Sequence, residues 1–150
     1  MTTDTLSCPR CSRPLTPLRV GGTSTDVCEN CGGLWLDRLE LSRFEDPDSV
    51  FGDALVAHLS RIPAALVDHA ARLRCPRHPG AVMLRRAFSR KIPIQIDECP
   101  ECGGLWLDAG ELAQIRRYYG RRHDGPGRSR SQAKTTETAP RRAVLRRAEA

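Results

Sequence analysis

Two groups of four residues have the types and the spacing of a tetrahedral metal site. Each group consists of two pairs, and in every pair two residues separate the partners. Thiolate sulfur and imidazole nitrogen are donors that Zn²⁺ prefers, and a complete set of four leaves no position for a substrate. We therefore predict two structural zinc ions. The predicted ligands are Cys8, Cys11, Cys28 and Cys31 in the first group, and Cys75, His78, Cys99 and Cys102 in the second.

The number of cysteines favours bound metal over disulfide bonds. Seven cysteines cannot all pair, whereas seven cysteines and His78 make two complete sets of ligands. Iron also binds to paired cysteines, but the histidine in the second set favours zinc. Free thiols are typical of reducing compartments, so we expect a cytoplasmic protein. The first ten residues, MTTDTLSCPR, lack the apolar segment of a signal peptide, and no apolar run could span a membrane.

The second pair of each group lies in a stretch that the chain contains twice. Residues 28–41 read CENCGGLWLDRLEL and residues 99–112 read CPECGGLWLDAGEL, which are identical at ten of fourteen positions. Such a repeat indicates two copies of one structural unit. Units of about 40 residues usually need metal or disulfides in order to fold. We therefore predict a small metal-stabilised α+β protein with two tandem zinc ribbons, each a β-hairpin with two ligand-bearing knuckles and a C-terminal helix.

Each pair of knuckles is predicted to flank a β-hairpin. In the first ribbon, strands over 15–20 and 23–27 surround Gly21-Gly22, a dipeptide that favours a tight turn. In the second ribbon, the strands are predicted over 83–88 and 91–97.

Each repeat is predicted to end in a helix. Asp37 and Asp108 fit the N-cap position, and an acidic residue three positions later completes a variant of the capping box. We expect the second helix to end at Gly120, which is a typical residue at the C-terminal end of a helix. Because capping explains these carboxylates, they are not assigned a role in acid–base catalysis.

The whole chain divides into four predicted segments. They are zinc ribbon one over 1–46, a helical connector over 47–74, zinc ribbon two over 75–120, and a tail over 121–150. Apolar residues recur at helical spacing from Phe51 to Leu73, and Pro63 interrupts them, so the connector is either one kinked helix or two short ones. The tail is rich in arginine and poor in large apolar residues, so we expect it to be disordered.

The positive charge of the chain is concentrated in this tail. Residues 121–150 hold nine of the 24 basic residues and three of the 18 acidic residues, and they account for the whole net charge of +6. The remaining residues are balanced in charge. The ribbons are therefore not basic by composition, and the tail is the segment suited to phosphate contacts.

The two tryptophans of the chain, Trp35 and Trp106, occupy the same position in both repeats. We expect each indole to cover its own metal knuckle and to anchor the following helix on the hairpin. The alternative is a partly exposed platform on which a base or a peptide stacks.

The repeated pattern C-P-x-C … D-x-C-x-x-C-G-G-L-W-L-D-x-x-E-L resembles a bacterial family of zinc ribbons named for the ribbon of transcription factor IIB. The resemblance covers residues 8–44 and 75–118. The chain departs from the pattern at His78 in place of a cysteine, at Glu29 in place of the usual proline, and at Arg38-Leu39, where the second repeat has Ala-Gly. The resemblance implies a zinc-binding module associated with nucleic acid or transcription.

Two hypotheses for function follow. The first is a transcription-associated accessory factor whose tail contacts the phosphates of DNA or RNA. Basic residues around the second hairpin and helix are expected to add a basic surface if they line up. These residues are Arg85, Arg86, Arg90, Lys91, Arg116 and Arg117. The alternative is a protein–protein interaction module. No nucleophile–base pair or phosphate loop is present in the sequence, so we expect neither enzymatic activity nor a small-molecule substrate.

Overall fold

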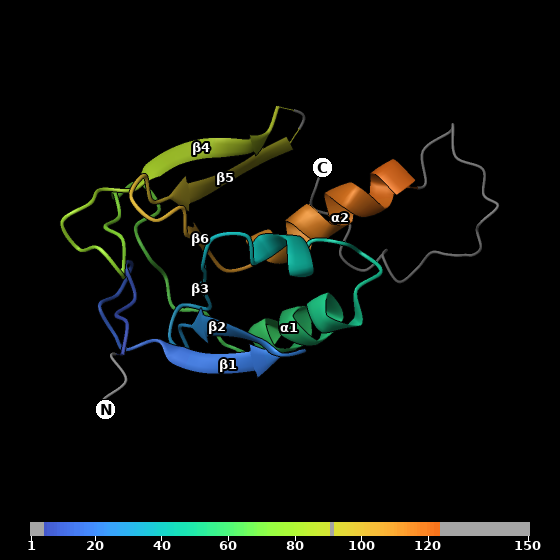
Figure 1. The fold of residues 1–150 in the computed structure, drawn as a ribbon, viewed down its shortest axis with the longest axis horizontal. Helices are drawn as coiled ribbons and strands as arrows, with labels where there is room; N and C mark the ends of the chain where they lie inside the picture. Colours follow the sequence, from blue (N-terminus) through green and yellow to red (C-terminus); the bar gives the residue numbers. More distant parts are fainter. Residues whose placement is uncertain (1–4, 91, 124–150) are drawn as a thin grey trace.

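Both repeats contribute to one antiparallel sheet of six strands, in the order β1-β2-β3-β6-β5-β4 (Figure 1). This computed structural model describes residues 5–90 and 92–123, so Lys91 and the segment 124–150 lie outside the described residues. The two hairpins form the outer parts of the sheet, and a short strand from each repeat forms its centre. The strands are β1 (Thr16–Val20), β2 (Thr23–Val27), β3 (Leu34–Leu36), β4 (Leu84–Ser89), β5 (Ile92–Glu98) and β6 (Leu105–Leu107).

The central strands β3 and β6 are the same Leu-Trp-Leu sequence, and they pair with each other. Trp35 lies opposite Trp106, and Leu34 lies opposite Leu107. Because Leu34 is equivalent to Leu105 in the repeat, this antiparallel register relates the two ribbons by an approximate two-fold axis. The arrangement is that of a symmetric dimer interface within one chain.

The side chain of each tryptophan extends across this axis to the opposite repeat. A Cβ atom built on Gly33 would lie 2.0 Å from the ring of Trp106, and one built on Gly104 would lie 2.2 Å from the ring of Trp35. Each indole therefore lies on the second glycine of the opposite repeat. Both tryptophans are completely buried, so the alternative of a partly exposed stacking platform is wrong.

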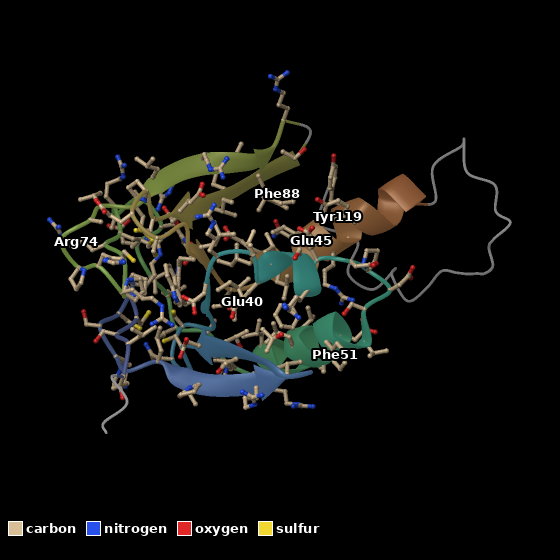
Figure 2. All side chains as sticks on the ribbon, viewed as in Figure 1. Glu40, Glu45, Phe51, Arg74, Phe88 and Tyr119 are labelled. Atoms are coloured by element: carbon tan, nitrogen blue, oxygen red, sulfur yellow. The ribbon has the colours of Figure 1, made fainter. Side chains whose placement is uncertain are left out.

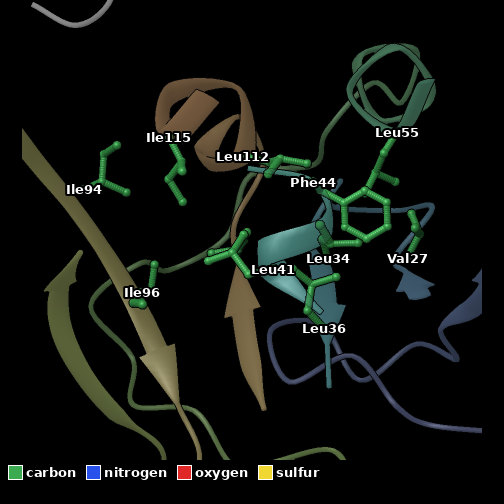
Figure 3. Close-up of a cluster of buried hydrophobic side chains, with 11 residues drawn as sticks. Val27, Leu34, Leu36, Leu41, Phe44, Leu55, Ile94, Ile96, Leu112 and Ile115 are labelled. Atoms are coloured by element: carbon green, nitrogen blue, oxygen red, sulfur yellow. The ribbon is translucent and has the colours of Figure 1, made fainter. Parts of the chain in front are cut away.

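The main apolar core lies on the face of the sheet opposite the two tryptophans, and the helices cover it (Figure 3). Leu34 and Leu36 point to this face, while Trp35 between them points to the opposite one, as the alternation of a strand requires. Leu55 and Phe44 cover the first ribbon, and Leu112 and Ile115 cover the second. The helical elements are η1, a 3₁₀ turn (Leu41–Arg43), α1 (Val50–Ser60) and α2 (Glu111–His123).

Both predicted hairpins are confirmed. The first spans β1 and β2 in regular register, with Val20 opposite Thr23 and positive φ at Gly21 and Gly22. In the second hairpin, β4 and β5 lie within a residue or two of the predicted strands, with an irregularity between Ala87 and Ser89.

The helix predicted directly after the first repeat does not form. Only η1 appears there. The next helix, α1, lies in the first half of the predicted connector and begins at Val50, with the side chain of Ser49 accepting a hydrogen bond from the amide of Gly52 at 3.1 Å. Pro47 provides the reason, since it would fall in the interior of a helix that starts at Glu40 and would break its hydrogen bonding. The second repeat has Tyr118 at the equivalent position and forms the long helix α2.

The second helix extends beyond its predicted end. It continues through Gly120 to His123, so the first three residues assigned to the tail belong to α2. A glycine inside a helix costs about 1 kcal/mol but does not have to end it.

The second half of the predicted helical connector, after Pro63, is also not helical. Its backbone carbonyls are occupied by arginines from both ribbons. Arg10 donates to the carbonyls of Asp68 and Ala71, and Arg85 donates to those of His69 and Ala71. These long-range hydrogen bonds replace the helical ones that the apolar spacing predicted. No helix among the described residues is long and apolar enough to cross a membrane.

Substitution of either glycine under an indole tests the contact between the repeats. We predict that Gly33→Ala and Gly104→Ala each destabilise the protein by about 3 kcal/mol, because the added methyl group overlaps a buried ring. Denaturant unfolding of the zinc-loaded protein measures this effect. Gly80→Ala is the matched control, since a Cβ there meets nothing within 4 Å, and it should change stability little. Equal stability of all three variants would show that the indoles do not lock the ribbons together.

The turn after each repeat provides a second test. Leu39 has a φ of +72° and is 78% exposed, whereas the equivalent residue of the second repeat is Gly110, with a φ of +87°. A left-handed conformation is strained for leucine. We predict that Leu39→Gly stabilises the protein by about 0.5–1 kcal/mol and that Gly110→Ala destabilises it by about 1 kcal/mol. Thermal unfolding of both variants measures the two changes, and a loss of stability in Leu39→Gly would contradict the assignment of strain.

Candidate metal centres

The first predicted ligand set forms one cluster of sulfur atoms. The four Sγ atoms of Cys8, Cys11, Cys28 and Cys31 all lie within 4.8 Å of one another. Measured separations are 3.7 Å for Cys8–Cys31, 3.5 Å for Cys8–Cys11 and 3.4 Å for Cys11–Cys28. Zn–S bonds of about 2.3 Å place tetrahedral sulfurs about 3.8 Å apart, whereas a disulfide needs about 2.05 Å. The cluster therefore has the dimensions of a zinc site.

The second cluster contains three sulfur atoms. Cys75, Cys99 and Cys102 lie within 4.8 Å of one another, and the Sγ atoms of Cys75 and Cys102 are 3.7 Å apart. His78 is exposed, and its ring nitrogens do not belong to this cluster. The two clusters are compatible with two structural zinc sites, and the role of His78 as a fourth ligand stays a prediction.

Backbone amides point at the sulfurs in both centres. In the first, the amides of Arg10 and Cys11 donate to the Sγ of Cys8 at 3.3 and 3.4 Å. Such bonds stabilise a thiolate, but burial opposes it and raises the pKa of Cys75 to about 12. A thiolate at Cys75 therefore needs a nearby cation, which Zn²⁺ would supply when it binds.

The sulfur atoms gather at one end of the molecule, away from the helices (Figure 2). There they form a second buried cluster, on the opposite face of the sheet from the main core, together with Trp35, Trp106, Leu73 and Met83. The tryptophans thus lie beside the metal centres, as predicted. Their indoles join the two ribbons, however, and do not serve one knuckle each.

The first knuckle of each ribbon is also linked by a bidentate ion pair to the turn that follows the central strand of the opposite repeat. Arg10 donates to both carboxylate oxygens of Asp108, at 2.9 Å each. Arg77, at the equivalent position of the second knuckle, donates to both oxygens of Asp37, at 2.5 and 2.8 Å. Each aspartate also accepts a hydrogen bond from the indole of its own repeat, at 3.1 Å for Asp37 and 2.9 Å for Asp108.

These pairs correct the prediction for the two aspartates. Their side chains do not cap a helix, because the carboxylates bind arginine and indole. Only the other half of the predicted capping box is present, in which Glu40 accepts from the amide of Asp37 and Glu111 accepts from the amide of Asp108. The arginines were missed by the sequence analysis, although the sequence Pro-Arg within both first knuckles was a signal that could have found them.

The two ion pairs differ in burial. The side chains of Arg10 and Asp108 are 2% and 8% exposed, whereas those of Arg77 and Asp37 are 42% and 36% exposed. Although burial opposes ionisation, hydrogen bonds from Arg10 and Trp106 lower the pKa of Asp108 below its ordinary value. Burial raises the pKa of the neighbouring Glu111 to about 8, so at neutral pH most of this carboxyl group is protonated. The connector covers only one of the two equivalent pairs.

The predicted basic surface is largely used for internal contacts. Arg85 donates to Asp97 at 3.1 Å, and Arg86 pairs with Glu98. Arg116 is buried and donates to Asp53 at 2.9 Å, as well as to three carbonyls of the loop before α1.

The remaining three predicted residues do not complete a basic face. Arg117 is buried, Arg90 lies in the exposed turn after β4, and Lys91 is outside the described residues. In the described part of the chain the predicted residues do not form one exposed basic face. Their role in nucleic-acid binding stays a prediction.

The equivalent aspartates provide a matched pair of substitutions. We predict that Asp108→Asn destabilises the protein by about 3 kcal/mol, because it leaves the buried guanidinium of Arg10 without a counter-charge. Asp37→Asn should cost about 1 kcal/mol or less, because the exposed Arg77 is solvated and screened. Denaturant unfolding of the zinc-loaded variants compares the two, and equal losses would show that the connector does not bury the first pair.

Comparison with known proteins agrees with this geometry. A family model described as a transcription factor zinc-finger matches residues 7–46 and 80–117, which together make up just over half of the chain. The second match begins after Cys75 and His78, the ligand pair at which the two ribbons differ. No curated protein and no solved structure gives a match. With both matched segments forming a hairpin beside a cluster of cysteines, the chain belongs to the transcription factor zinc-finger family and carries two copies of its zinc ribbon.

Proposed function

We propose that the protein is a nucleic-acid-associated accessory factor in which the zinc ribbons carry a basic tail. The distribution of charge carries this proposal. Residues 121–150 account for the whole net charge of +6; the first three of them belong to α2, and the rest follow directly on it. The family description, transcription factor zinc-finger, supports the same class of function. We assign no catalytic step to the chain, and we place it in the cytoplasm, where the thiols stay reduced.

The internal contacts of the arginines in the folded part support binding of nucleic acid through the tail. Arg10, Arg85 and Arg116 bind carboxylates and backbone carbonyls within the described part of the chain. These guanidinium groups are not available for phosphates. Binding through the tail would then depend on charge and be sensitive to salt, with little preference for base sequence.

A protein–protein interaction module is the second candidate, and a cavity between the two helices favours it. The cavity has a volume of about 80 Å³. Such a volume is below the few hundred Å³ of a typical cofactor site but accepts an apolar side chain. Its apolar walls are formed by Leu34, Val56, Leu59, Leu107 and Leu112.

Binding of zinc-loaded protein to labelled DNA and RNA over a salt series tests the tail proposal. We predict binding by the full chain, with an affinity that falls steeply as salt rises. Replacing four tail arginines by glutamine should lower the slope of log K against log salt by up to about 0.9 per lost phosphate contact on duplex DNA. The substitutions are Arg141→Gln, Arg142→Gln, Arg146→Gln and Arg147→Gln.

A variant with the same net charge controls for overall electrostatics. It carries four substitutions at exposed arginines of the folded part that are not among the predicted nucleic-acid contacts, namely Arg13→Gln, Arg38→Gln, Arg43→Gln and Arg61→Gln. This variant should keep most of the binding. Equal losses in both variants would indicate attraction by net charge alone. Failure of the wild-type chain to bind near physiological salt would reject the nucleic-acid proposal and leave the protein partner.

A further inference from the structure

The two metal centres differ at the second ligand of the first knuckle. In the first centre the Sγ of Cys11 lies among the other sulfurs, 3.5 Å from Cys8 and 3.4 Å from Cys28. In the second centre the equivalent residue is His78, whose side chain is exposed and lies outside the three-sulfur cluster. Within the described residues, no hydrogen bond or ion pair holds the His78 ring. The second centre therefore has three converging ligands and one that is not held in place.

The backbone of His78 nevertheless occupies the ligand position. The amides of Arg77 and His78 donate to the Sγ of Cys75 at 3.3 Å each. The amides of Arg10 and Cys11 make the same two contacts with Cys8. The difference between the two centres thus begins at the side chain and in the residues that follow it. A rotation of the His78 side chain can bring the imidazole toward the sulfurs without breaking the knuckle.

The turn after the ligand also differs between the two centres. In the first knuckle the amide of Ser12 donates to the carbonyl of Cys8 at 2.9 Å, and the amide of Cys8 donates to the carbonyl of Arg13 at 2.7 Å. Ser12 has a φ of +64°, which closes this tight turn.

The second knuckle cannot form the same turn. Pro79 stands where Ser12 stands in the first, and proline has neither an amide hydrogen nor access to positive φ. The amide of Cys75 donates instead to the carbonyl of Ala81 at 3.0 Å, one residue beyond the position equivalent to Arg13. The amide of Ala81 donates to the carbonyl of His78 at 2.7 Å. The loop is one residue longer, and residues 77–80 are all exposed.

We propose that the second centre holds its zinc through Cys75, Cys99 and Cys102, with His78 as an exchangeable fourth ligand. Three protein ligands with an open fourth position are typical of zinc sites that accept an external donor, whereas four fixed ligands are typical of closed structural sites. The second centre then releases its metal sooner than the first and accepts a soft external donor such as a thiol. This inference rests on zinc binding and is independent of the proposed role in nucleic-acid binding.

Release of zinc to a chromogenic chelator tests the difference between the centres. The full chain loaded with two zinc ions should show two phases of one zinc each, with rates at least about tenfold apart. His78→Cys should remove the fast phase, because a fourth sulfur closes the site. Persistence of an unchanged fast phase in this variant, or a single phase in the wild type, would overturn the proposal.

A second variant separates an exchangeable ligand from a fixed one. His78→Ala should still bind two zinc ions, keep the wild-type circular dichroism spectrum, and release the second zinc at a rate within a few-fold of the wild type. Loss of one zinc ion or of folded structure would show that His78 is a fixed ligand.

Cobalt substitution gives a spectroscopic readout of the same position. Addition of 2-mercaptoethanol to the Co²⁺-loaded wild type should shift the d–d bands of half of the bound cobalt, and it should leave His78→Cys unchanged. An unchanged wild-type spectrum would overturn the proposal.

Discussion

The pairing of β3 with β6 is the constraint on which the rest of the structure depends. It joins two identical Leu-Trp-Leu strands in a self-complementary register and brings each tryptophan onto a glycine of the other repeat. The leucines then face one core and the tryptophans face the other, which contains the cysteines. Neither ribbon has an independent interior, because both buried clusters contain side chains from both ribbons. The two repeats therefore form a dimer within one chain, and each metal centre supports the shared sheet.

This symmetric arrangement carries asymmetric additions. The connector crosses only one of the two arginine–aspartate pairs, so Arg10 and Asp108 are buried while Arg77 and Asp37 stay accessible to solvent. The helices also differ, because Pro47 prevents the first repeat from forming a helix at the position where the second forms α2. The second knuckle has a proline after its histidine and a longer loop. Each difference is local in the sequence, and each changes one half while the β3–β6 pairing stays the same.

The use of charge in the folded part bears on function. Several arginines could have contacted an acidic partner. Their guanidinium groups instead donate to carboxylates and backbone carbonyls of the same chain. These arginines therefore stabilise contacts within the described fold. The family relationship identifies the ribbons, and most of the predicted basic residues in the described part make internal contacts.

The sequence alone determined the elements whose signals are local. Ligand spacing identified the two cysteine clusters, and alternation with Gly-Gly identified the hairpins, because neighbouring residues decide these features. It did not reveal that Asp37 and Asp108 bind arginines from the opposite repeat, or that the carbonyls of 68–71 accept from Arg10 and Arg85 instead of forming a helix. Those outcomes depend on contacts between residues far apart in the chain. Only the tertiary structure decided them, because the free energy of satisfying a buried guanidinium outweighs the local preference for a helical turn.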